Sequence, residues 1–341
     1  MTVTYRTRRR LQTAGKVFLC LLLAALVIWV CWFMWLERFV VYSADGAHLR
    51  LDRPATFEGG EVAVPPENIT VAIHYNEGSD KVNTSSELGQ ISGYYASTSM
   101  LLDSVEKVDQ AIQELPAGSA VVLDLKSIYG NFYYNTKIPG APVADARDAG
   151  QVDKLIKNLV NSDFYLIARV PAFRDRAYGL ENTHYGLAVS GGYLWWDDEN
   201  CYWLNPASNG SISYLIAIAT ELRDLGFDEV LFHEFRFPDT SEIIINSSLS
   251  REEAITQAAE KVVTSCATEQ FAVSFETGDE QFPLPAGRCR LYLTGVSAAK
   301  AQSVLDASTV PVKESQLVFF TETNDTRFDI ASVVRMLTVS D

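Results

Sequence analysis

The chain has 341 residues, of which 48% are hydrophobic and 21% are charged, and its formal net charge is −15. A chain of this length and composition can bury a large core in one or two globular domains. Its negative balance repels phosphate groups, which argues against nucleic acid as a partner.

The charge is unevenly distributed along the chain. Residues 1–38 hold six of the 28 Lys and Arg residues and one of the 43 Asp and Glu residues. The remainder therefore carries 22 basic and 42 acidic residues, a net charge of about −20. This balance suits a domain that stands off an anionic surface, although it also serves solubility alone.

An uncharged apolar run at 17–36 follows a basic amino-terminal tail at 1–16. At a rise of about 1.5 Å per residue, a helix of this length spans about 30 Å, which matches the hydrocarbon core of a bilayer. We therefore predict a transmembrane anchor at 17–36. A cleaved signal peptide is the alternative, but its apolar region is shorter and a small-residue cleavage site follows it.

The basic tail before the anchor is expected to stay in the cytoplasm. The sequence thus predicts a single-pass protein of the cell membrane with a cytoplasmic amino terminus and an extracellular carboxy-terminal domain. Residues 37–90 contain the turn-forming pairs Asp45-Gly46, Gly59-Gly60 and Pro65-Pro66, so we predict a stalk or linker there.

Short apolar runs alternate with segments of helical periodicity from residue 91 onward. We predict seven strands, at 91–96, 120–125, 165–170, 230–235, 271–275, 291–293 and 317–320. We predict helices at 100–115, 152–160, 212–225, 251–265, 298–305 and 330–337. Ser250 and Glu253 form a capping-box pattern at one helix start, and Gly226 follows the end of another helix.

Alternation of strands and helices predicts a parallel sheet covered by helices. A TIM-type (β/α)8 barrel and a doubly wound open sheet both fit, but no Gly-x-Gly-x-x-Gly follows a strand. We predict the α/β barrel over 91–341, with an eighth strand that is missing, shortened or hidden between 291 and 317. The cysteines and histidines lack metal-ligand spacing, so we predict no metal site and no cofactor.

Several charged residues fall at the carboxyl ends of predicted strands, where parallel α/β folds bind their ligands. They are Asp124, Lys126, Arg169, His233, Glu234, Arg236 and Glu276. A binding site explains such a set better than a structural ion-pair network, because burying many charges is costly.

Glycoside hydrolysis requires two carboxyl groups, and Glu276 with either Glu234 or Asp124 could supply them. Neighbouring residues of a strand face opposite sides, so His233 and Glu234 cannot both point inward unless the strand has ended.

The segment from Arg174 to Gly210 is rich in aromatic residues and acids. Sugar-binding sites combine aromatic faces with carboxylates, so we predict that Trp195, Trp196 and Trp203 contact carbohydrate. The alternative is a loop that packs its own aromatic residues onto the barrel.

Residues 192–238 resemble a family of bacterial glycosyl hydrolase domains with (β/α)8 barrels related to amylase-like barrels. The resemblance is carried by Leu194-Trp195, Trp203-Leu-Asn205-Pro206, Leu225-Gly-Phe-Asp-Glu229 and Arg236-Phe-Pro238. Weaker matches, at Asp124-x-Lys126, Ala168-Arg169 and Val273-Ser274-Phe-Glu276, extend it over about 90–341.

The family resemblance implies a glycoside hydrolase that acts on extracellular or cell-wall carbohydrate. Glu276 and Glu234 would form its acid/base pair, and Asp124, Lys126, Arg169 and Arg236 would organise the site. However, His233 stands where the family has its expected catalytic Asp, and an imidazole cannot form a glycosyl ester. The alternatives are an inactive barrel that binds carbohydrate or an envelope partner, and a surface scaffold without a sugar site.

Overall fold

A computed structural model describes Trp29, residues 40–43 and 46–49, and residues 88–339 apart from 145 and 246–248. The chain divides into two compact units, Met1–Ser79 and Asp80–Asp341. In the first unit, β1 (Val40–Ser43) pairs antiparallel with β2 (Gly46–Leu49), within the predicted stalk. The predicted tail and anchor lie outside the described residues except for Trp29. None of the helices in the described part is long and apolar enough to span a membrane.

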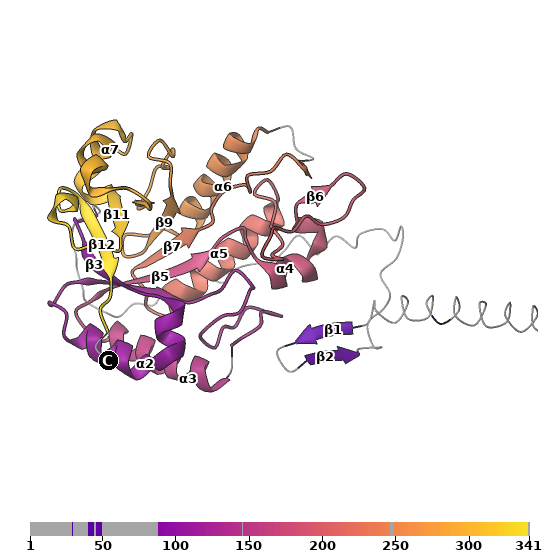
Figure 1. Cartoon of the computed structure of the whole chain (residues 1–341), viewed down its shortest axis with the longest axis horizontal. Coiled ribbons are helices and arrows are strands. Elements are labelled where there is room, and N and C mark those ends of the chain that lie inside the picture. The colour runs from indigo at the N-terminus through magenta and orange to yellow at the C-terminus, as the bar shows by residue number, and fades with distance from the viewer. Residues whose placement is uncertain are drawn as a thin grey trace, which may run out of the picture. The chain divides into compact units, whose positions relative to one another are not determined.

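Eight parallel strands close into a barrel in the second unit (Figure 1). Neighbours in the ring follow chain order, and the last strand pairs with the first. The strands are β3 (Ser92–Ala96), β4 (Ala120–Asp124), β5 (Tyr165–Pro171), β7 (Glu229–His233), β9 (Ala272–Thr277), β10 (Leu291–Leu293), β11 (Leu317–Thr321) and β12 (Ser332–Met336). The predicted TIM-type barrel is confirmed, with β10 as its shortest strand.

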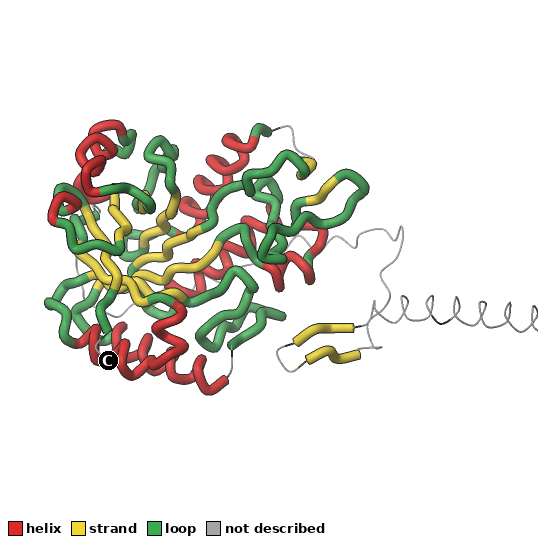
Figure 2. Tube along the Cα trace, in the orientation of Figure 1, coloured by secondary structure: helices red, strands yellow, loops and turns green. Residues whose placement is uncertain are grey.

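Helices cover the outside of the barrel (Figure 2). The long ones are α2 (Thr98–Gln113), α3 (Ala146–Val160), α5 (Asn209–Asp224) and α6 (Arg251–Cys266), and the short ones are α4 (Arg176–Glu181), α7 (Ala301–Ala307) and α8 (Lys313–Gln316). Ser250 and Glu253 form the predicted capping box of α6. Gly226 follows α5 at φ +99°, a backbone conformation that favours glycine.

The predicted helix at 330–337 is wrong, because this segment forms β12, the eighth strand. Val334 faces the barrel interior, while the alternate residue Val333 joins the outer core. Pairing with β11 and β3 on both sides satisfies the backbone groups that a helix would satisfy internally. The eighth strand therefore does not lie between 291 and 317.

The barrel interior is apolar at mid-height and polar at both ends. The inner apolar cluster takes residues from seven of the strands: Tyr95, Ala120, Val122, Ile167, Leu231, Tyr292, Val318 and Val334. At the amino ends of the strands, the buried carboxylate of Glu229 pairs with Arg290 and accepts hydrogen bonds from Tyr165 and Tyr292. This polar cluster fills the amino end of the interior, so a site inside the barrel has to lie at the carboxyl end.

Candidate functional site

Three charged side chains meet at the carboxyl end of the barrel, here called the mouth. Arg169 in β5 donates through Nε and Nη2 to the two carboxylate oxygens of Glu276 in β9, at 2.6 and 2.8 Å. Its Nη1 donates to Oδ1 of Asp124, the last residue of β4, at 2.8 Å. One guanidinium therefore bridges two of the three acids that the sequence placed at this rim.

Two aromatic rings and a threonine complete the surroundings of this triad. The guanidinium of Arg169 lies 5.5 Å from the ring centre of Tyr95 and 5.7 Å from that of Phe320. The Tyr95 hydroxyl donates to Asp124, which also accepts from the backbone and hydroxyl of Thr98. Burial and the charge of Asp124 raise the pKa of Tyr95, so this hydroxyl is a neutral donor. Sequence reasoning missed Tyr95 and Phe320, whose only signal is their place in apolar strands.

His233 lies in the mouth because it follows the inward-facing Leu231 by two residues of β7. Burial, followed by the charges of Arg169, Lys126 and Arg174, holds its pKa well below the usual value, so the imidazole is neutral. Among the described residues, none forms a hydrogen bond with the ring. A neutral imidazole can both donate to and accept from a ligand.

Glu234 belongs to a different cluster from Glu276. The strand ends at His233, and Glu234 adopts φ 51°, which turns the chain out of the strand geometry. Its carboxylate pairs with Arg236 at 2.8 Å and with Arg174 at 3.3 Å. Glu234 and Glu276 therefore have different arginine partners.

Arg174 joins this second cluster to the aromatic segment. It bonds Asp197 at 2.6 Å and Glu199 at 3.1 Å, and the Trp203 indole donates to Asp197 at 2.9 Å. Burial alone would raise the pKa of Asp197, but the hydrogen bonds from Arg174 and Trp203 lower it below its usual value. The guanidiniums of Arg174 and Arg236 lie over the Trp203 ring, whose side chain is buried. Trp203 therefore anchors the segment and presents little surface to a ligand.

Residues 186–204 form an ordered projection, here called the arm, which is closed by bridges such as Gly186 to Leu204 and Trp196 to Tyr202. Trp195 is half-buried, and its indole donates to Glu242 at 3.0 Å. Trp196 and Tyr193, in contrast, are 54% and 73% exposed. Of the three predicted sugar-binding tryptophans, Trp196 is the one that is open to solvent.

Lys126 bonds to none of Asp124, Arg169 and Glu276. Its side chain is fully buried and bonds Asp175 at 2.5 Å, and Asp175 also accepts from the Tyr214 hydroxyl at 2.9 Å. Asp175 was not predicted, although its position before Arg176 suits the N-cap of α4 that it forms. This network joins β4, α4 and α5, which is a structural role.

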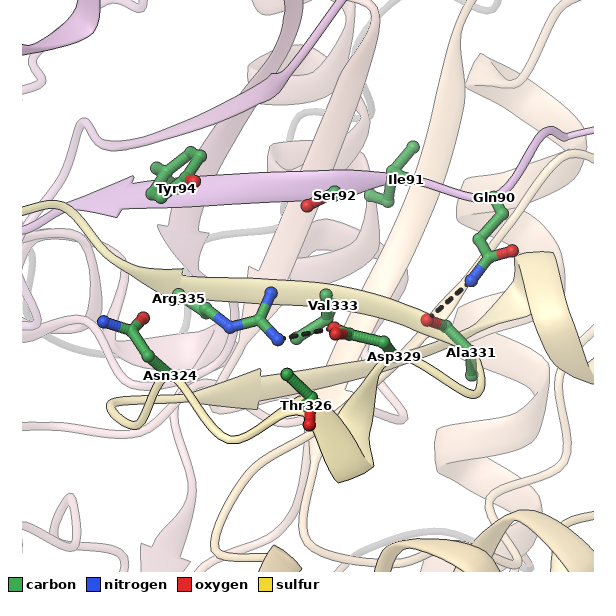
Figure 3. A pocket seen from close by; sticks show the side chains of 10 residues that line it. All are labelled: Gln90, Ile91, Ser92, Tyr94, Asn324, Thr326, Asp329, Ala331, Val333 and Arg335. Atoms are coloured by element: carbon green, nitrogen blue, oxygen red, sulfur yellow. Dashed lines mark hydrogen bonds and ion pairs between the residues drawn. The ribbon is translucent and has the colours of Figure 1, made fainter. Parts of the chain in front are cut away.

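A cavity of about 540 Å³ lies apart from the mouth, on the outer face of β3 and β12 beside the short 3-10 helix η3 (Thr326–Phe328) (Figure 3). We call it the outer groove. The outer groove is lined by Gln90, Ile91, Ser92, Tyr94, Asn324, Thr326, Asp329, Ala331, Val333 and Arg335.

Within the part of the chain that the structure describes, no group of three or more His, Cys, Asp or Glu residues could hold a metal ion.

A closed parallel barrel with acids and aromatic residues around the carboxyl ends of its strands defines a glycosidase-like TIM barrel. The family model described as "Putative glycosyl hydrolase domain" matches residues 93–274, and the chain belongs to this family. The matched segment runs from β3 into β9, so Glu276 and the last three strands lie beyond it.

Several solved structures are similar to this chain, while no curated protein matches it in sequence. One is a hypothetical protein from Ruminiclostridium thermocellum ATCC 27405, at 25% identity over 53% of this chain and 96% of that chain, with a TM-score of 0.43. Another is the GH36 α-galactosidase AgaA from Geobacillus stearothermophilus in complex with stachyose. It is 12% identical over 73% of this chain and 39% of that chain, with a TM-score of 0.49.

A third is the GH20 exo-β-N-acetylglucosaminidase from Vibrio harveyi in complex with N-acetylglucosamine. It is 11% identical over 69% of this chain and 42% of that chain, with a TM-score of 0.46. The chain spans about two fifths of the length of these two enzymes.

Proposed function

We propose that this chain binds carbohydrate at the barrel mouth and the arm without hydrolysing it. Residues 17–36 would anchor it in the cell membrane with the barrel on the extracellular side. The observation that carries the proposal is the position of Arg169, whose single guanidinium bonds both Asp124 and Glu276.

Hydrolysis of a glycosidic bond needs one carboxylic acid that donates a proton and a second carboxylate that attacks or activates water. Both oxygens of Glu276 accept hydrogen bonds from Arg169, so neither is left to donate a proton to a sugar. Asp124 is held by Arg169, Tyr95 and Thr98. A substrate would have to displace the Arg169 guanidinium from Asp124 and Glu276 to use the two as a catalytic pair.

Binding requires fewer groups than hydrolysis, and several groups of the mouth and the arm suit a sugar. The exposed rings of Trp196 and Tyr193 in the arm offer apolar faces to the C–H groups of a pyranose, and exposed apolar groups are typical of binding sites. The neutral imidazole of His233 can exchange hydrogen bonds with a hydroxyl group. Arg236, which is about half exposed, adds a charged donor beside them.

A glycoside hydrolase is the second candidate, and membership of the family favours it. In that case a substrate would displace Arg169 from Asp124 and Glu276, which would then act as the two carboxyl groups. The pair of Glu276 with Glu234 requires a larger change, because Glu234 would have to leave Arg174 and Arg236.

A binding survey with a matched surface variant tests the proposal. The full chain, kept in a detergent without a sugar headgroup, would be titrated with peptidoglycan fragments and soluble polysaccharides. We expect at least one ligand whose affinity falls about tenfold in Trp196→Ala. Val312→Ala also removes an exposed apolar side chain, but it lies before α8 and β11 at the amino end of the barrel. Equal losses in the two variants, or no ligand at all, would refute binding at the arm.

A further inference from the structure

The outer groove lies on the outer face of β3 and β12, and none of its lining residues belongs to an α-helix. The strands β3 and β12 close the barrel here, and after β12 the described chain continues only through residues 337–339, without a helix. The outward-facing side chains Ser92, Tyr94 and Arg335 of these strands therefore line a cavity instead of packing under a helix (Figure 3).

Arg335 is the main hydrogen-bond donor of the outer groove. Its side chain is 12% exposed, and its Nη2 bonds Asp329 at 2.5 Å and the Asp325 carbonyl at 3.5 Å. Its Nε and Nη1 have no hydrogen-bond partner within the described residues. Figure 3 shows the guanidinium among the lining side chains, with one nitrogen directed at Asp329. Because a guanidinium carries five N–H donors, three remain for a ligand.

The other polar lining groups are amides and hydroxyls. The side-chain nitrogen of Gln90 donates to the Ala331 carbonyl at 2.9 Å, which leaves its amide oxygen as an acceptor. Asn324 adds a second amide, and Thr326 adds a hydroxyl from η3. The half-buried ring of Tyr94 supplies an aromatic surface. The groove thus offers donors, acceptors and an apolar face together, as carbohydrate sites do.

Charge narrows the class of ligand. Arg335 and Asp329 are the charged side chains of the lining, and they pair with each other, so the outer groove carries no net charge. An anion would meet Asp329, which is half exposed, on a chain whose formal charge is −15. A cation would meet the free N–H groups of Arg335. An uncharged ligand with many hydroxyl groups avoids both conflicts.

We propose that the outer groove is a second carbohydrate-binding site, which takes an uncharged sugar unit independently of the mouth. Its volume of about 540 Å³ lies in the usual range for small-molecule sites. The proposal rests on the proposed carbohydrate binding for its class of ligand, but on none of the residues of the mouth or the arm.

Titration of the full chain with three named probes tests this site. Cellotetraose and chitotetraose are neutral, and tetragalacturonate is anionic. We expect a neutral tetrasaccharide to bind, and its affinity at this site to fall about tenfold in Arg335→Lys, which keeps the positive charge near Asp329 but removes the planar N–H edges. Asn324→Ala, on an exposed loop, is expected to weaken binding without affecting the fold, which thermal unfolding would verify.

The Trp196→Ala variant separates the two sites. We expect it to leave binding at the outer groove intact, so that the remaining affinity still responds to Arg335→Lys. The proposal is overturned if neither neutral probe binds to Trp196→Ala, if only tetragalacturonate binds, or if Arg335→Lys and Asn324→Ala bind as the wild type does. If Trp196→Ala binds every probe as the wild type does while Arg335→Lys loses affinity, binding at the arm is refuted and the outer groove stands.

Discussion

At the scale of single residues, Arg169 determines the chemistry of the mouth, because it is the ion-pair partner of both Asp124 and Glu276. Removing one member of a buried ion pair leaves the other uncompensated, at a cost of about 3–5 kcal/mol. The three side chains are 11–14% exposed, so we expect Arg169→Ala to lower the free energy of unfolding by about 3 kcal/mol. Urea denaturation measures this loss, and Arg169→Lys, which keeps the charge, should lose less. A loss below about 1 kcal/mol for Arg169→Ala would mean that the triad contributes little to stability.

His233 makes stability depend on pH. Its pKa is lowered in the folded chain, so below a pH of about 6.5 the unfolded chain takes up a proton that the folded chain does not. Stability should therefore fall as the pH drops through 6.5, by up to about 1.4 kcal/mol per pH unit from this group. Unfolding free energies between pH 5 and 7.5 should show a shallower slope in His233→Asn. His184→Asn, at an exposed position, is the control and should keep the wild-type slope.

The sequence correctly predicted which residues reach the mouth where those residues lie within strands, but not where they lie beyond a strand end. Asp124 and Arg169 lie within β4 and β5, where alternation of side chains holds, and the structure brings them together. Lys126 lies two residues beyond Asp124, which suggests the same side, but β4 ends at Asp124. Beyond the strand, Lys126 bonds Asp175, which lies 49 residues away in the sequence. Such a partner is set by tertiary packing, which no local pattern reports.

At the scale of elements, the seven predicted strands all form because their apolar runs are short and bounded by turn residues. The segment 330–337 was misread because alternation in Ser332–Met336 covers only five residues, too few to separate a strand from a helix. Its identity follows from the barrel, since β12 is needed to join β11 to β3. Apolar runs between turn residues therefore identified seven of the strands, and the closure of the barrel identifies the eighth.

The capping box of α6 provides a test of local stability. The Ser250 side chain accepts from the backbone of Glu253, and the Glu253 side chain accepts from the backbone of Ser250 at 2.7 Å. We expect Ser250→Ala to lower the free energy of unfolding by about 1 kcal/mol. Ser250→Asp should lose much less stability, because Asp is also a good N-cap residue. Chemical denaturation of the three proteins measures this. If Ser250→Ala has the same free energy of unfolding as the wild type, packing alone stabilises α6.

At the scale of the whole molecule, the basic tail and the apolar run at 17–36 predict where the barrel resides. We expect the full chain to remain in the membrane fraction after an alkaline carbonate wash, because a spanning helix resists extraction. Protease added to intact cells should digest the barrel and spare an epitope at the amino terminus. Deletion of residues 1–36 is expected to release the protein from the membrane. Carbonate-soluble full chain, or a barrel protected from protease, would contradict the predicted topology.

The central claim is our proposal that the bridge of Arg169 between Asp124 and Glu276 lets the barrel bind sugar but prevents it from cleaving sugar. The direct measurement is the appearance of new reducing ends, followed by NMR, when the full chain is incubated with a carbohydrate that it binds. The account predicts saturable binding and no product in prolonged incubation, for the wild type and for Glu276→Gln alike. Product that the wild type forms and Glu276→Gln does not would contradict it.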